Sequence, residues 1–515
     1  MGYKEEKEEF VSGSTGGTVT RINLTCLTAL TTYALWTVVN ARLAKGNKPV
    51  AWKLASIEFS ILILPLLFAL TLFSDYPLTF NIVISTLAIA LHSLPAPNDI
   101  PPLSPMPEKV SQFSSIARIE VKPFSKPFVT SYRAIMMVMT IICILAVDFP
   151  IFPREFAKAE TWGTSLMDLG VGSFVFSLGV VSSLPLLRQT EERRPYLKSV
   201  LSSIKKALPV IALGCVRVIM VKGVEYPEHV TEYGVHWNFF FTMALIPVFG
   251  TALERFATSI DAHWIGLIVS IAHQSLLSFT SLQEWTLDAA RTDLISQNKE
   301  GIVSFPGYLA IHLLGLASGL YILPPDPYFF SIHHQSIPSD APSEVRRKSE
   351  EKRSLKVWRE KPGKLANLLG SYAIVWWVTY YLSISFTGCQ VSRRLANLPY
   401  VLWITAFNTS FLFLYLVVHL VATNASSSTA ASTSTSPSLH SSQPSSSPIS
   451  APLIFEAINR NGLIVFLVAN LLTGLINVSI ETMYSSKFTS ISILVSYSSL
   501  VVGVAWSLRR KRLKI

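Results

Sequence analysis

Charged residues are scarce in this sequence, and their scarcity excludes a soluble globular protein. Of the 515 residues, 15% are Asp, Glu, Lys or Arg and half are hydrophobic, whereas a soluble domain carries about 25% charged residues. The apolar runs between the charged segments reach about 17 to 25 residues, which is the length of a helix that spans a bilayer. The composition therefore indicates an all-α, polytopic integral membrane protein.

Cysteine chemistry and the common catalytic signatures are also missing. Four cysteines occur, and no two have CxxC spacing, so the sequence supports neither a disulfide framework nor a zinc or redox site. It contains no Walker loop, no GxSxG elbow and no DxD pair, and no obvious match to the Asn-and-His pattern of the membrane-bound O-acyltransferases. No internal repeat is evident, which disfavours a transporter built from two related halves.

Thirteen apolar runs alternate with polar segments. An odd number of spans puts the termini on opposite sides, and the basic tail indicates a cytosolic C-terminus and a luminal N-terminus. In this orientation the cytosolic segments hold 31 Lys and Arg residues and the luminal segments 11, as the positive-inside rule predicts. The same rule explains the net charge of +11 without a nucleic-acid partner. The runs are 22–40, 54–74, 78–94, 134–148, 163–186, 207–221, 237–253, 263–279, 303–323, 366–386, 399–421, 463–480 and 488–508.

The sequence divides into one multi-pass membrane domain, 1–515, with two conspicuous cytosolic loops. Residues 325–364 are rich in charge, and 424–452 are mostly Ser, Thr, Ala and Pro, so we expect the second loop to be disordered. The first twenty residues include four glutamates. We therefore expect no cleavable signal peptide, and the first span must serve as the targeting signal.

The stretch 148–179 concentrates charge and aromatic residues at a predicted luminal boundary. Asp148 ends an apolar run, and Pro150 and Pro153 prevent that helix from continuing. Arg154 and Lys158 are four residues apart and could share one face, which predicts a short interfacial segment that is charged on one side. Its apolar face would carry Phe149, Phe152 and Phe156.

The span after this segment carries a carboxylate and a stripe of small residues. Asp168 lies inside it, and an intramembrane carboxylate needs a partner, for which Arg217 is our candidate. The small residues recur at seven-residue intervals and predict close helix packing. They are Gly163, Gly170 and Ser177 in one row, and Ser165, Gly172 and Gly179 in the other.

Two further predicted luminal segments are rich in polar groups. His229, Glu232 and His236 would share one helical face, which fits a wall around a polar headgroup, interfacial packing or, least well, a zinc site; no metal is expected. Arg393 and Arg394 lie on the luminal side against the charge bias. Arginine binds phosphate with paired hydrogen bonds, so these residues fit either a phospholipid phosphate or pairing with luminal glutamates.

These stretches carry a resemblance to a known family. The segment that begins DFPIFPREFAK at residue 148, with EHVTEYGVHWNFF at 228–240, SRRLANLPY at 392–400 and NRNG at 459–462, resembles the fungal GPI-anchored wall transfer protein 1 family. The animal PIG-W proteins are its counterparts. The resemblance implies an endoplasmic reticulum enzyme that transfers a fatty acyl group from acyl-CoA to the inositol of glucosaminyl-phosphatidylinositol. We expect palmitoyl-CoA as the donor, and no cofactor besides this co-substrate.

Acyl transfer to a hydroxyl group assigns roles to the luminal residues. The reaction needs a base for the hydroxyl proton and a donor for the developing oxyanion. We expect Asp148 to be the base, with His229 in reserve, and Lys158 to stabilise the oxyanion or to hold Asp148; a purely structural ion pair is the alternative. The expected substrate-binding residues are Arg154, Trp162, Asp168, His229, Glu232, His236, Trp237, Arg393, Arg394 and Asn397. A lipid transporter or flippase is the rival function, and a non-catalytic assembly factor is a third.

Overall fold

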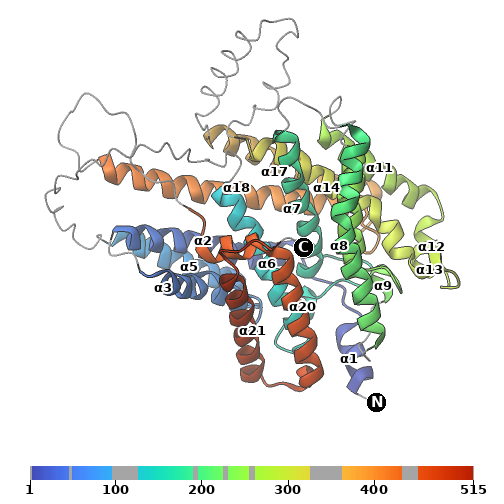
Figure 1. Cartoon of the computed structure of the whole chain (residues 1–515), viewed down its shortest axis with the longest axis horizontal. Helices are drawn as coiled ribbons and strands as arrows, with labels where there is room; N and C mark the ends of the chain where they lie inside the picture. Colours follow the sequence, from blue (N-terminus) through green and yellow to red (C-terminus); the bar gives the residue numbers. More distant parts are fainter. Residues whose placement is uncertain are drawn as a thin grey trace, which may run out of the picture.

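A computed structural model describes residues 3–45, 49–94, 126–188, 195–223, 230–253, 261–324, 362–431 and 450–513. Across these ranges the regular structure is helical, with a single isolated bridge between Gly17 and Thr164 (Figure 1). The all-α prediction is therefore confirmed for the described chain.

A helix occupies each of the thirteen predicted apolar runs. Ten helices in the described ranges have the length and hydropathy needed to span a bilayer. Helices α5 and α10 are shorter apolar helices, and α17 is long enough but is not among the ten. The thirteen are α2 (Val19–Lys45), α3–η1–α4 (Ala51–Glu58, Phe59–Ile63 and Leu64–Ala69), α5 (Pro77–Ser93), α6 (Pro127–Ala146), α7 (Leu166–Arg188), α8 (Tyr196–Gly223), α10 (Phe239–Leu253), α11 (Ala262–Phe279), α14 (Lys299–Ile322), α17 (Pro362–Thr387), α18 (Leu398–Ala431), α20 (Gly462–Ser479) and α21 (Lys487–Ser507).

Internal prolines bend or loosen these helices without ending them. Pro209 and Pro247 lie inside α8 and α10, because backbone groups freed by proline can find other partners inside a helical bundle. Pro65 follows η1, a π-helical stretch within the second span. A proline removes one N–H from the ladder, and π-bulges commonly absorb such a disruption.

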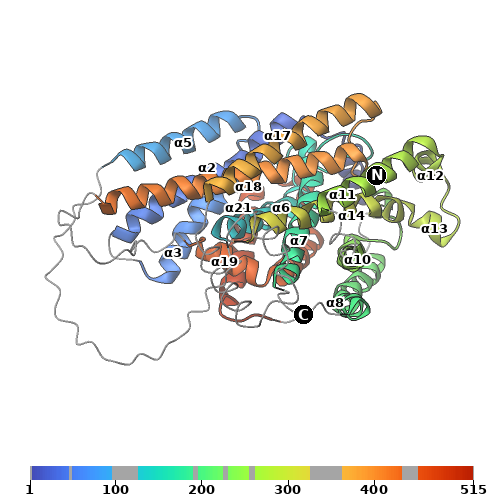
Figure 2. The ribbon, with the colours of Figure 1, turned by 90° about the horizontal axis from the view of Figure 1, so that it is seen from above.

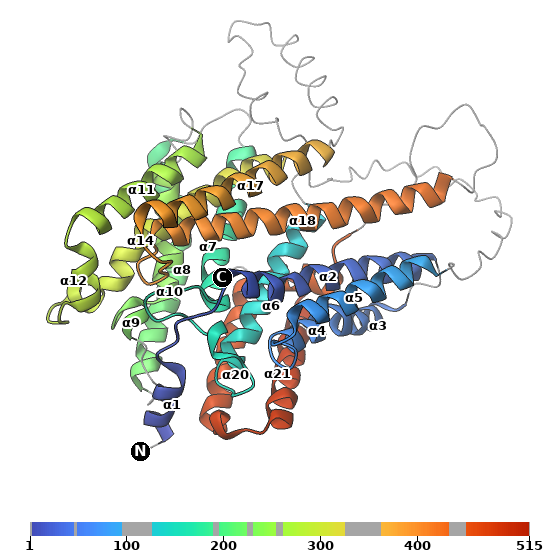
Figure 3. The ribbon, with the colours of Figure 1, turned by 180° about the vertical axis from the view of Figure 1, so that it is seen from behind.

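Neighbouring helices pair along their lengths. Figure 2 shows α17 beside α18, and Figures 1 and 3 show α20 and α21 as an antiparallel pair. Short elements connect the long ones or precede them. They are α1 (Tyr3–Val11), η2 (Arg154–Phe156), α9 (Val230–Tyr233), α12 (Leu282–Asp288), α13 (Leu294–Gln297), α19 (Leu453–Arg460) and η4 (Thr482–Tyr484).

Polar contacts connect helix ends that the alternation of the spans assigns to the same side of the membrane. Segments assigned to the luminal side contact one another through ion pairs: Arg21 with Asp75 and Glu155, Lys158 with Glu232, and Arg394 with Glu300. Segments assigned to the cytosolic side also meet. The Asn461 side chain, for example, donates to the carbonyls of Leu508 and Lys511 at 3.3 and 2.8 Å. None of these contacts joins a segment assigned to the luminal side to one assigned to the cytosolic side.

Helices extend into both of the predicted loops. Helix α18 continues to Ala431, so the first part of the Ser- and Thr-rich segment 424–452 is helical; 432–449 lie outside the described residues. Helix α17 begins at Pro362, inside the predicted loop 325–364, and 325–361 are likewise not described. A helix can continue into polar residues because serine and alanine tolerate helical backbone where water replaces the bilayer.

The small-residue stripe packs α7 against two other helices. A Cβ atom added to Gly179 would lie 2.1 Å from the His312 carbonyl oxygen on α14, and one added to Gly172 would meet Ile404 on α18 at 2.5 Å. Gly315 makes the reciprocal approach to the Phe176 carbonyl oxygen at 2.2 Å. The prediction of close helix packing is confirmed for Gly172 and Gly179.

We predict that Gly179→Ala destabilises the protein by about 1 to 3 kcal/mol, because the added methyl group must push two backbones apart. The measurement is the thermal midpoint of the purified protein in detergent. Gly474→Ala is the matched control, since a Cβ at Gly474 on α20 meets nothing within 4 Å. Equal midpoints for both variants would contradict the role of the α7–α14 contact.

Candidate functional site

The segment 148–165 is a buried loop rather than an interfacial helix. Its regular structure is confined to the single turn of η2. Phe149, Phe152 and Phe156 are at most 1% exposed and belong to the main hydrophobic core. The expected interfacial segment therefore packs into the core, because three aromatic side chains gain more from full burial than from an interface.

Arg154 satisfies backbone carbonyls at the end of helix α6. Its Nη2 atom donates to the carbonyl oxygens of Val147, Phe149 and Phe152 at 2.7 to 3.3 Å. A cation that satisfies carbonyls at a helix C-terminus also complements the helix dipole. These contacts favour a structural role over the predicted substrate contact.

The N-terminal segment holds this loop in place. The Gly17 amide donates to the Thr164 carbonyl at 2.7 Å, and the Gly163 amide donates to the Val391 carbonyl at 2.8 Å. Gly163 has φ of 128°, and a Cβ there would lie 2.0 Å from the Thr15 carbonyl oxygen. Glycine is required at this position because no other residue fits both the conformation and the space.

Asp148 is paired with the N-terminus of the chain and not with Lys158. Its Oδ1 atom lies 3.5 Å from Lys7 Nζ, and its Oδ2 atom accepts a 2.8 Å hydrogen bond from the Asn477 side chain. Asp148 is only 2% exposed. Burial raises the pKa of this carboxyl group, and the Lys7 charge and the Asn477 hydrogen bond oppose that rise. The expectation that Lys158 holds Asp148 is wrong.

Lys158 starts a chain of charges that runs into the protein. Its Nζ lies 2.6 Å from Glu232 Oε1, and the same oxygen lies 3.6 Å from Arg393 Nη1. Arg393 Nε donates to Asp168 Oδ1 at 2.5 Å. Burial would raise the pKa of Glu232, but the charges of Lys158, Arg393 and Arg217 outweigh it and lower that pKa to about 2. Glu232 is therefore ionised throughout the physiological pH range.

Asp168 pairs with Arg393. The expected pairing of Asp168 with Arg217 is therefore wrong. The second carboxylate oxygen of Asp168, Oδ2, accepts the Ala159 amide at 2.9 Å, and its backbone carbonyl accepts the Tyr400 hydroxyl at 2.8 Å. Asp168 thus joins the start of α7 to the 148–165 loop and to α18. Arg217 contributes its charge to Glu232 instead.

Arg394 completes a second ion cluster. Its Nη2 lies 2.8 Å from Glu300 Oε1, and the same oxygen lies 2.5 Å from Arg291 Nη2. Arg393 and Arg394 thus both pair with acidic side chains. The sequence had left this alternative open. The Arg394 Nε atom has no hydrogen-bond partner among the described residues.

Asn397 stabilises the turn that carries both arginines. Its Oδ1 accepts the amides of Ser392 and Tyr400, and its Nδ2 donates to the Gln390 carbonyl. The preceding residue, Ala396, has φ of 45°, an unfavourable value for a residue with a side chain. These bonds occupy the Asn397 amide oxygen and one of its two N–H groups, and the expected substrate hydroxyl contact stays a prediction.

The other predicted binding residues mostly support the structure. The amides of His236 and Trp237 donate to Asn298 Oδ1, and Trp237 Nε1 donates to the Thr242 hydroxyl. Trp162 packs against the core around Leu395. His229 lies outside the described residues, so the reserve base is not placed. Within the described ranges no three His, Cys, Asp or Glu residues gather in a way that would hold a metal.

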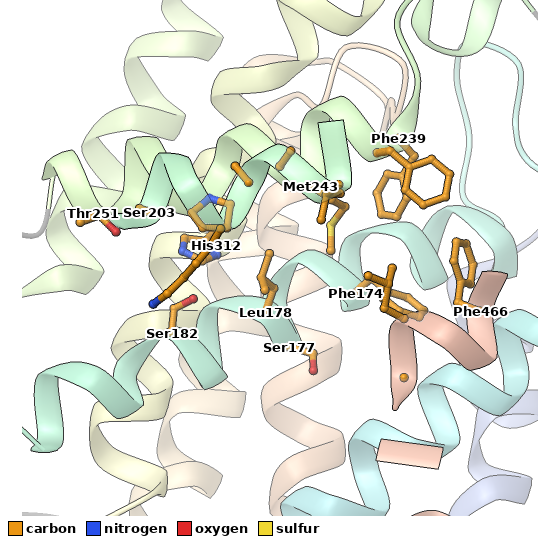
Figure 4. Close-up of a pocket in the computed structure, with 18 of the residues that line it drawn as sticks. Phe174, Ser177, Leu178, Ser182, Ser203, Phe239, Met243, Thr251, His312 and Phe466 are labelled. Atoms are coloured by element: carbon orange, nitrogen blue, oxygen red, sulfur yellow. The ribbon is translucent and has the colours of Figure 1, made fainter. Parts of the chain in front are cut away.

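A cavity of about 560 Å³ lies among α6, α7, α8, α10, α14 and α20. Figure 4 shows that polar side chains, including His312, Ser182 and Ser203, occupy one end. Phe174, Phe239 and Phe466 occupy the other end. Lys206 and Asn459, which also line it, come from the predicted cytosolic ends of their helices. The cavity therefore changes from polar and cationic to aromatic along its length.

The aromatic end of the cavity borders the Lys158 chain of charges. The ring of Phe239 lies 6.3 Å from that of Tyr233. The Arg393 guanidinium carbon lies 5.7 Å from the centre of the Tyr233 ring, which is a cation–π distance. One aromatic layer thus separates the cavity from the Arg393–Glu232–Lys158 group.

The sequence did not indicate three members of these clusters. Lys7 lies in an acidic N-terminal stretch, Asn477 sits near the end of an apolar run, and Glu300 precedes another run. Each looks like an ordinary flanking residue. Only the repeated placement of polar residues at predicted luminal helix ends could have selected them, and that signal does not identify partners.

Sequence comparisons agree with this architecture. A profile of the GWT1 family matches residues 3–508. The chain is 39% identical to GPI-anchored wall transfer protein 1 of Aspergillus fumigatus, with 100% of this chain and 99% of that protein aligned. The proteins of the same name from Gibberella zeae and Cryptococcus neoformans var. grubii are 37% and 34% identical, with 98% and 100% of this chain and 97% and 100% of those proteins aligned. The chain therefore belongs to the GWT1 family of multi-pass membrane proteins involved in GPI-anchor processing.

Proposed function

We propose that the protein is an O-acyltransferase that moves a fatty acyl group from acyl-CoA to the inositol ring of glucosaminyl-phosphatidylinositol. The observation that carries this proposal is the cavity, whose aromatic end adjoins a layer of buried charges. An acyl donor has an apolar chain, a polar thiol carrier and a reactive carbonyl between them. The cavity offers a polar end for the carrier and an aromatic end for the chain.

The proposed orientation places this charged layer in the lumen of the endoplasmic reticulum. The N-terminus is then luminal and the C-terminus cytosolic. The charge bias of 31 to 11 supports this orientation. The grouping of polar contacts at the helix ends supports strict alternation of the spans.

The polar end of the cavity would hold the thiol carrier of the donor. Lys206 supplies a cation close to the predicted cytosolic surface, where acyl-CoA is made. His312 is 1% exposed, and its Nδ1 atom has no hydrogen-bond partner in the described part of the chain. A buried polar atom beside a cavity is available to bond an amide or carbonyl of the ligand.

In the proposed reaction the two luminal clusters act together. An inositol hydroxyl oxygen attacks the thioester carbonyl carbon while the Asp148 carboxylate accepts the hydroxyl proton. Lys158 stabilises the negative charge that develops on the carbonyl oxygen. The carbon–sulfur bond then breaks, the ester remains on inositol, and the proton passes to the departing thiolate of coenzyme A. Contact between the lipid phosphate and Arg393 or Arg394 stays a prediction.

We predict that the purified protein converts labelled acyl-CoA and glucosaminyl-phosphatidylinositol to the inositol-acylated lipid. Asp148→Asn should lower kcat by about 10²- to 10⁴-fold, because asparagine cannot accept the hydroxyl proton. Lys158→Met should lower it by up to about 10³-fold. Folding is checked by acyl-CoA binding. Absence of product from the wild-type protein would favour a transporter or an assembly factor.

A second prediction concerns the cavity. Met243→Trp should fill its middle and raise the KM for acyl-CoA more than the KM for the glycolipid. His312→Leu should raise the donor KM by about 2- to 13-fold, the value of one neutral hydrogen bond. Leu475→Trp is the control, because Leu475 is 61% exposed on the outer surface of α20. Equal effects on both substrates would remove the donor from this cavity.

A further inference from the structure

Lys7, on the N-terminal helix α1, is the cationic partner of Asp148, the proposed base. Lys7 Nζ lies 3.5 Å from Asp148 Oδ1, 3.0 Å from Asn477 Oδ1 and 3.4 Å from the Thr482 hydroxyl. The Lys7 side chain is 6% exposed and that of Asp148 is 3% exposed. Figure 3 shows α1 beside the end of α20 that carries Asn477. Four residues from three distant segments thus form one buried cluster.

The contacts in this cluster do not occupy every acceptor position of the carboxylate. Its two oxygens offer about four lone-pair positions. Lys7 approaches Oδ1 at a long distance, and Asn477 uses one position on Oδ2. The Asn477 amide therefore fixes the plane of the carboxylate, while Lys7 supplies charge without occupying every acceptor position.

We propose that Lys7 is a positioning residue for acyl transfer: its ammonium group keeps the buried Asp148 ionised and, together with Asn477, correctly oriented. This inference rests on the proposed function and on Asp148 as the base. It makes the N-terminal helix α1 part of the active site, although α1 lies outside the membrane spans.

The electrostatic reason is that burial and pairing act on Asp148 in opposite directions. Burial raises its pKa and would leave a neutral acid, which cannot accept a proton. The positive charges that lower the pKa again come from Lys7 and, less strongly, from Arg154. Asn477 and Thr482, the groups on α20 and η4 that face the pair, are neutral. Lys7 is therefore the main source of positive charge at this carboxylate.

A pH–rate profile tests the inference. A nearby opposite charge lowers a carboxyl pKa by about 1 to 3 units. In Lys7→Met the pKa of Asp148 rises, so the acid limb of kcat should move to higher pH by that amount. Lys7→Gln, which can still hydrogen-bond to Asn477, should show the same shift, whereas Lys7→Arg should keep the wild-type profile. Lys53→Met is the control, because Lys53 is exposed on the other side of the molecule.

The outcomes separate the inference from the proposed function. An unmoved acid limb in folded Lys7→Met and Lys7→Gln overturns the role of Lys7 while acyl transfer stands. Normal turnover of Asp148→Asn removes Asp148 as the base, and with it the role of Lys7, while acyl transfer stands. Absence of product from the wild type refutes the proposed function itself. If Lys7→Met does not fold, the double variant Lys7→Met/Asp148→Asn should regain folding, because it no longer buries an unpaired charge. Failure of that rescue also contradicts the pairing.

Discussion

The structure depends on the rule that a charge removed from water must be paired. An isolated buried carboxylate is too costly to persist, so three of those here are matched by cations, while Glu58 accepts the backbone amides of Leu453 and Ile454. Asp148 meets Lys7, Asp168 meets Arg393, and Glu300 meets two arginines. These pairs join loops that the bilayer would otherwise leave independent. The same pairing that orders this end of the protein also concentrates reactive groups there.

The helices were predictable because a bilayer imposes their length. Each apolar run of suitable length became a helix, even where Pro209 or Pro247 made the prediction weak. The small-residue stripe could also be predicted, since spacing along one helix determines which residues share a face. The helices and the small-residue stripe both depend on residues that are close together in the sequence. The sequence alone therefore predicts them.

The partners within the site were not predictable in this way. Asp148 and Lys158 are close in sequence, yet each bonds to a residue far away along the chain. The prolines that end α6 allow the loop to turn its phenylalanines inward, and this turn directs the two charged side chains to different neighbours. Asn397 was predicted to contact the substrate, and its bonds also hold a turn in which Ala396 has a positive φ. Partner choice depends on three-dimensional packing, which spacing alone does not encode.

The close contact between α7 and α14 determines which wall of the cavity can move. Helices whose backbones touch through Gly179 and Gly315 lose packing as soon as they separate. The opposite walls, α8 and α20, are covered much less, since 11% of each span is buried within the protein. The free energy of local opening is lowest where few contacts are broken. Fluctuations that widen the cavity will therefore occur at the walls formed by α8 and α20, while the α7–α14 wall stays fixed as a reference surface for the proposed acyl chain.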